Sequence, residues 1–161
     1  MLTINSISTT VTIRQREVQE VANIEKLVQE HEAWSYESLT QLLSQDSVKL
    51  LLATNAAREV QGYCLYQVIF EQAEILRIGT HPDYHRQGTA AKLFTALHAT
   101  LAAYQVESLL LEVRADNLPA IALYQQQGFI VIHRRSGYYQ QALKPSIDAL
   151  IMQLNYTESL N

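Results

Sequence analysis

Cysteine is almost absent from this 161-residue chain, and Cys64 is the only one. A lone cysteine excludes an intramolecular disulfide framework and favours a reducing compartment. Because Cys64 lies inside an apolar run, a small buried side chain is favoured over a reactive thiol.

An excess of positive charge is also missing. Lys and Arg number 12 against 16 Asp and Glu, which gives a formal net charge of −4. Nucleic-acid-binding proteins need a basic surface, so this balance argues against a nucleic-acid partner. It weakly favours cationic or amine partners.

Long hydrophobic runs are absent too. No apolar stretch reaches the roughly 18 residues that a membrane span requires. The N-terminal residues, MLTINSISTTVTIRQR, contain neither a basic region nor the apolar core of a secretory signal. We therefore expect a cytoplasmic protein that does not enter a membrane.

The composition that remains is that of a globular protein, with 48% apolar and 17% charged residues. We find no internal repeat, low-complexity block or interdomain linker. The length suits one core, so residues 1–161 are expected to form a single domain.

Hydrophobic spacing predicts a mixed α/β chain. Four helices are expected, at residues 17–31, after a Ser35 cap, at 89–104 and at 118–127. Strands are expected at residues 10–14, 48–54, 60–70, 73–80, 108–113, 129–135 and 148–154, with a hairpin across 55–59. The strand–helix–strand order of the second half implies local parallel pairing within a three-layer α/β domain.

Glu112 interrupts the apolar strand LLLEV. An unpaired buried carboxylate costs several kcal/mol, so such a group finds a partner, reaches water or becomes neutral. Two interpretations are open: an ion pair with Arg114 or exposure to solvent, or a carboxylate that lines a functional cleft.

The stretch HRQGTA, residues 85–90, joins a strand to a long helix. Gly88 permits close approach of a ligand, and free N–H groups at the helix start favour an anion, with Arg86 beside them. The stretch lacks the ending of a P-loop and the second glycine of a dinucleotide fingerprint. An ordinary loop with a glycine at a helix start is the alternative.

His85 to Ala90 resemble the acetyl-CoA pyrophosphate loop of the GNAT superfamily of N-acetyltransferases, Arg/Gln-x-x-Gly-x-Gly/Ala. Three further blocks, IGTHPDYHRQGTAAKLF, LLLEVRADNLPAIALYQQQGF and RRSGYYQ…DALIMQL, resemble the branch that acetylates the N-terminal alanine of a ribosomal protein. The similarity runs from Ile78 to Leu154 and is thin before Trp34. Departures are His85 in place of glutamine, Ala90 in place of glycine, and Ala33 in place of proline.

The resemblance implies a GNAT-like mixed sheet that splays between strands 73–80 and 108–113, with helices on both faces. It implies Glu112 as the base and Tyr124 as the acid, with a core aromatic the alternative for Tyr124. Asn117, seven residues before Tyr124, shares its helix face and is expected to contact acetyl-CoA. The other expected acetyl-CoA contacts are Ile78, Gly79, Thr80, Arg86, Gln87, Gly88, Thr89, Ala90 and Ala91. A bulge is expected at Gly79.

The implied acceptor side consists of Trp34, Ser35, Tyr138 and Tyr139, although the two tyrosines could instead pack at a strand end. The function implied is acetyl transfer from acetyl-CoA to a protein N-terminus, with a ribosomal-protein alanine as acceptor. A small-molecule amine acceptor and a non-catalytic acetyl-CoA-binding module are the alternatives. No metal is expected, because the five histidines lack ligand spacing. The chain is expected to be a monomer or weak dimer.

Overall fold

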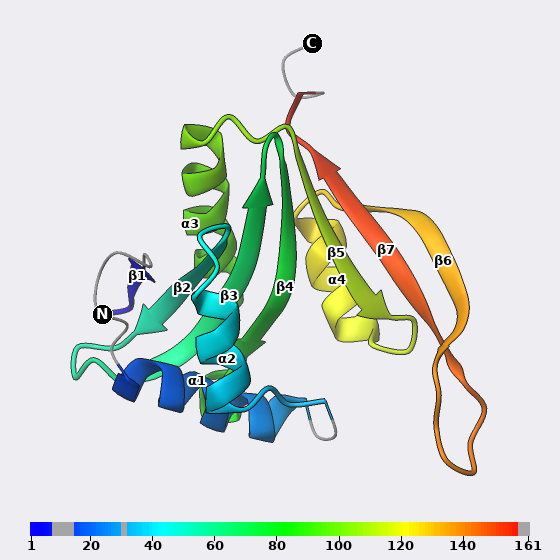
Figure 1. The fold of residues 1–161 in the computed structure, drawn as a ribbon, viewed down its shortest axis with the longest axis horizontal. Helices are drawn as coiled ribbons and strands as arrows, with labels where there is room; N and C mark the ends of the chain where they lie inside the picture. The colour runs from blue at the N-terminus through cyan, green and yellow to red at the C-terminus, as the bar shows by residue number, and fades with distance from the viewer. Residues whose placement is uncertain (8–14, 30–31, 158–161) are drawn as a thin grey trace.

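The computed structural model describes residues 1–7, 15–29 and 32–157, which form a seven-stranded sheet with helices packed on it (Figure 1). The strand expected at residues 10–14 and the expected helix end at His31 lie outside the described residues. The elements are β1 (Thr3–Ile7), α1 (Gln15–Val28), α2 (Tyr36–Leu43), β2 (Val48–Thr54), β3 (Val60–Ile69), β4 (Gln72–Thr80), η1 (Pro82–Tyr84), α3 (Thr89–Ala103), β5 (Ser108–Arg114), α4 (Leu118–Gln126), β6 (Ile130–Tyr139) and β7 (Ile147–Asn155).

The strands lie in the order β1-β2-β3-β4-β5-β7-β6. Neighbouring strands are antiparallel except β4 and β5, which are parallel and joined through α3. The expected β2–β3 hairpin and the local parallel pairing are therefore confirmed. The last strand, β7, enters between β5 and β6, so the strand that follows α4 is not the neighbour of β5.

Helices cover both faces of the sheet, as expected. One core contains α3 residues such as Leu93, Phe94 and Leu97, together with Tyr124 of α4. The other core packs α1 and α2 against β2 and β3, with Val21 and Leu39 among its members. Cys64 is fully buried, which confirms its packing role.

The helix with the predicted Ser35 cap begins where the sequence indicates, and Asn117 caps α4 as well. Ser35 Oγ accepts a hydrogen bond from the Ser38 N–H at 3.1 Å at the start of α2. At the start of α4, Asn117 Oδ1 accepts from the Ala120 N–H at 3.3 Å, and Pro119 lies in the first turn. None of the helices in the described part of the chain is long and apolar enough to span a membrane.

The sheet splays between β4 and β5. Their pairing joins Gln72–Ile75 to Ser108–Leu111 and then stops, although both strands continue. Figure 1 shows the two strands separating beyond that point, with α4 behind the gap. The splay predicted from the family resemblance is confirmed.

Candidate functional site

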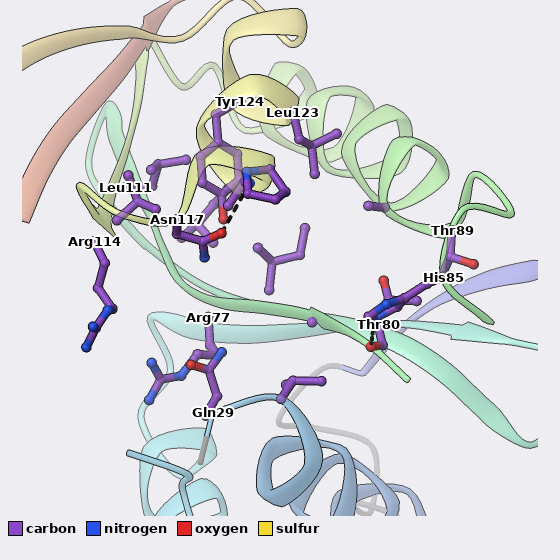
Figure 2. A pocket seen from close by; sticks show the side chains of 18 of the residues that line it. Gln29, Arg77, Thr80, His85, Thr89, Leu111, Arg114, Asn117, Leu123 and Tyr124 are labelled. Carbon is purple, nitrogen blue, oxygen red and sulfur yellow. Dashed lines mark hydrogen bonds between the residues drawn. The ribbon is translucent and has the colours of Figure 1, made fainter. Parts of the chain in front are cut away.

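A cavity of about 570 Å³ lies where β4 and β5 diverge (Figure 2). Its walls come from the ends of these two strands, the start of α3, one face of α4, the end of α1, and β6. Most of the predicted site residues line it: Ile78, Gly79, Thr80, Arg86, Gly88, Thr89, Ala90, Ala91, Glu112, Asn117, Tyr124 and Tyr139.

Four predicted site residues do not line this cavity. Gln87 lies instead in a smaller hollow of about 220 Å³ that it shares with Lys92. Ser35 is exposed and caps α2, and Tyr138 is exposed on β6. Trp34 lies behind Arg77, whose guanidinium carbon is 4.4 Å from the indole centroid. On the α1–α2 side, the cationic group that borders the cavity is therefore Arg77.

The start of α3 forms an open backbone turn. Arg86 and Gly88 both have positive φ, 60° and 78°. A Cβ added at Gly88 would meet no atom within 4 Å, so the space above the helix N-terminus is clear. Because the first N–H groups of a helix lack intrahelical partners, this end of the cavity suits an anion.

The inner edge of β4 offers a second row of backbone groups. Gly79 and Thr80 pair with β3 on one side, and none of the described strands pairs with them on the other. Gly79 is required by close packing, because a Cβ there would lie 2.8 Å from the Tyr63 ring. The expected bulge at Gly79 is wrong: the register shift lies between Ile75 and Arg77, which places the extra residue at Leu76.

Glu112 is held by groups from β6. Arg135 Nη1 lies 3.1 Å from its Oε2, and the Tyr139 hydroxyl donates to its Oε1 at 3.1 Å. The suggested pairing with Arg114 is wrong, because Arg114 bonds Asp116 through Nε and Nη2, each at 3.1 Å. Burial and the neighbouring Glu112 carboxylate raise the pKa of Tyr139 above its usual value.

Tyr124 packs in the core and also borders the cavity. Its ring contacts Phe94 and Phe129 at centroid distances of 6.1 and 6.0 Å, and Figure 2 shows the side chain pointing from α4 into the cavity beside Asn117. Burial raises the pKa of Tyr124 to about 12. The hydroxyl therefore keeps its proton at neutral pH. Tyr124 is both a core aromatic and a residue that lines the cavity.

A buried polar cluster beside the cavity was not predicted from the sequence. Glu25 of α1 is fully buried and accepts hydrogen bonds from the Tyr63 hydroxyl and, at 3.0 Å, from the Trp34 N–H. Arg77 Nε lies 3.4 Å from Glu25 Oε2, and Arg77 Nη2 donates to the Glu32 carbonyl at 2.9 Å. The sequence does indicate that Glu25 is buried, because Glu25 follows Val18 and Val21 at helical spacing on the apolar face of α1.

The described residues contain no cluster of His, Cys, Asp and Glu suited to a metal ion. His98 is engaged instead in a contact of 2.7 Å between its Nδ1 and the Tyr156 hydroxyl. His85 Nε2 lies 2.9 Å from the Thr80 carbonyl oxygen at the cavity edge.

Residues 15–129 match the model of the acetyltransferase (GNAT) family. Over 96 residues, 60% of this chain, the sequence is 38% identical to the [ribosomal protein bS18]-alanine N-acetyltransferase of Escherichia coli K12, and this alignment spans 64% of that enzyme. Identity to the Haemophilus ducreyi enzyme of the same description is 32% over 121 residues, which cover 75% of this chain and 82% of that one. The crystal structure of the ribosomal-protein-S18-alanine N-acetyltransferase from Escherichia coli superposes with a TM-score of 0.83 at 30% identity, covering 96% of this chain and 94% of that one.

Proposed function

The chain belongs to the GNAT acetyltransferase family, and from that premise we propose that it transfers an acetyl group from acetyl-CoA to the N-terminal amine of a protein. The preferred acceptor is an alanine N-terminus, with a ribosomal protein as the substrate. The observation that carries the proposal is the convergence of Glu112 and Tyr124, from β5 and α4, on one cavity.

The chain's own groups fit acetyl-CoA. The clear space above Gly88, the free N–H groups of α3 and the nearby Arg86 suit a pyrophosphate. The unpaired edge of β4 at Gly79 and Thr80 suits an extended arm that bears amides, which would pair with it as an added strand. Asn117 keeps its side-chain amide N–H₂ for the same arm, because the cap uses only its oxygen. When bound, acetyl-CoA supplies the thioester that carries the acetyl group.

The proton transfers are assigned to two residues. The acceptor amine reaches the cavity as an ammonium and must lose a proton before it can attack, and Glu112 accepts that proton. Arg135 and Tyr139 fix the carboxylate at the mouth of the splay. Tyr124 keeps its phenolic proton and donates it to the sulfur as the C–S bond breaks, and the second proton that the nitrogen loses as the amide forms restores the phenol.

The identity of the acceptor rests on two kinds of support. The Haemophilus ducreyi relative, aligned over 75% of this chain, is described as acting on a ribosomal-protein alanine. The end of α1, Glu32 and Tyr139 line the same cavity as Glu112. A small first side chain suits this part of the cavity, because a bulky one would displace the α-amine from Glu112.

The test is a competition for acetyl transfer among alanine-, glycine-, methionine- and lysine-starting peptides, free amino acids and spermidine. We expect the alanine-starting peptide to be preferred. Glu112→Gln and Tyr124→Phe should each lower kcat by on the order of 100- to 10,000-fold while acetyl-CoA affinity is kept. Matched controls are Glu107→Gln and Tyr104→Phe, which alter an exposed carboxylate and an exposed phenol that do not line the cavity.

Preference for spermidine or a free amino acid over every peptide would refute the acceptor. Wild-type turnover in both Glu112→Gln and Tyr124→Phe would refute the two proton-transfer roles. Acetyl-CoA binding without transfer to any amine would identify a non-catalytic module.

A further inference from the structure

We propose that Arg77 selects peptide acceptors by donating a hydrogen bond to a backbone carbonyl oxygen of the acceptor, and that it thereby discriminates against polyamines. This inference rests on the proposed function, because it concerns the acceptor side of the same cavity. Arg77 lines that cavity with Gln29 and Glu32. Figure 2 shows Arg77 and Gln29 on the side opposite Asn117 and Tyr124.

The bulge at Leu76 gives Arg77 its direction. Ile75 faces the core beneath α3, and regular alternation would turn Arg77 to that same face. The extra residue at Leu76 shifts the alternation, so that Arg77 pairs with Leu65 and both face α1. A bulge that re-aims one side chain beside a ligand cavity is a recurrent device in sheets.

Arg77 is held in place from three directions. Glu25 is its buried counter-ion, the Trp34 ring stacks on the guanidinium, and the Glu32 carbonyl accepts from Nη2. A guanidinium has five N–H groups, and its hydrogen bonds within the described part of the chain use one of them. The remaining Nη N–H groups are available to a ligand, because the side chain is 18% exposed and lines the cavity.

The chemistry of these donors favours a peptide. The carbonyl that follows an N-terminal α-amine is a hydrogen-bond acceptor, and a guanidinium forms strong charge-assisted bonds to such oxygens. Spermidine carries no such acceptor, and its distal ammonium groups would meet a fixed positive charge. Arg114 also lines the cavity and keeps Nη N–H groups that Asp116 does not use. The assignment to Arg77 rests on its fixed position between Glu25 and the Trp34 ring, on the α1 side of the cavity.

The test compares Arg77→Met with wild type on two acceptors, an alanine-starting peptide and spermidine. We expect kcat/KM for the peptide to fall about 10- to 100-fold, the usual cost of a lost charge-assisted hydrogen bond. The value for spermidine should stay the same or rise. Since Arg77→Met leaves Glu25 buried without its cation, the double variant Glu25→Gln/Arg77→Met is measured in parallel and should give the same ratio between acceptors.

A minimal pair of amines isolates the carbonyl. Alaninamide and isopropylamine share the CH₃–CH–NH₂ unit, and only alaninamide has the carbonyl. Arg77→Met should lower kcat/KM for alaninamide and not for isopropylamine, and the difference in basicity between the two amines cancels in the cycle. Arg134→Met is the matched control, because Arg134 is a cation paired with Asp148 that does not line the cavity.

Equal losses for peptide and spermidine, or no loss for either, would overturn the role of Arg77 and leave the proposed function intact. A wild-type protein that prefers spermidine to every peptide would overturn both.

Discussion

Replacing Glu25 with alanine should lower the free energy of unfolding by about 4 kcal/mol, a large share of the 5–15 kcal/mol typical of a domain. The side chain is fully buried and joins α1 to β3, β4 and the segment before α2. Its loss therefore affects four parts of the fold at once.

The magnitude follows from the groups left behind. The Tyr63 hydroxyl is buried, and the Trp34 N–H also loses its acceptor; each unsatisfied donor costs about 1–3 kcal/mol. Losing one partner of a fully buried ion pair costs about 3–5 kcal/mol. The cost here is smaller, because Arg77 is 18% exposed and keeps the Glu32 carbonyl. The costs at the Tyr63 hydroxyl, the Trp34 N–H and the Arg77 guanidinium do not simply add, because one local rearrangement can relieve all three. We therefore expect a total of about 4 kcal/mol.

Glu25→Gln separates hydrogen bonding from charge. The single amide oxygen can still accept from either Tyr63 or Trp34 while the other donor loses its acceptor, so the loss should be smaller, about 1–3 kcal/mol. Urea unfolding followed by circular dichroism measures both variants, with an unchanged m-value as evidence that the compactness of the states is kept. Gln19→Ala is the control, because the side chain of this exposed α1 residue bonds Asn23 one turn away, and it should stay within about 0.5 kcal/mol of wild type. A cost below about 1 kcal/mol for Glu25→Ala would refute the reasoning.

The parts of the site that the sequence predicts are those encoded locally. The glycine at a helix start predicts the open turn at Gly88, and helical spacing places Asn117 and Tyr124 on one face. The oddity of a carboxylate in an apolar strand points to Glu112. Each of these signals lies within a few consecutive residues.

The partners of Glu112 depend instead on the order of the strands. β7 enters between β5 and β6, and the register of these three strands brings Arg135 and Tyr139 to Glu112. The predicted strand ended at residue 135, but β6 extends to Tyr139. Tyr138 and Tyr139 therefore both lie within the strand. No local pattern specifies which strands become neighbours.

Arg77 was missed for a related reason. Alternation along residues 73–80 assigns it to the same face as Ile75, and only the pairing of β4 with β3 reveals the bulge that turns it. Trp34 was expected to form a wall of the acceptor site, but the Arg77 side chain covers its ring.

Two further predictions test the turn at α3 and the half-buried His98. Gly88→Val should weaken acetyl-CoA binding in calorimetry, because the added side chain projects into the clear space assigned to the pyrophosphate. Tm should fall only modestly, because the strain is confined to the backbone at φ 78°. Unchanged affinity would contradict the pyrophosphate assignment. For His98, burial lowers the pKa below the ordinary 6.5, so the unfolded chain binds a proton that the folded protein excludes. Stability is therefore fully present above about pH 6.5 and falls as the pH drops below that value. His98→Gln should flatten this dependence in urea titrations between about pH 7 and 5, because the amide does not titrate in that range; a slope equal to that of wild type would show that His98 takes up its proton without cost in the fold.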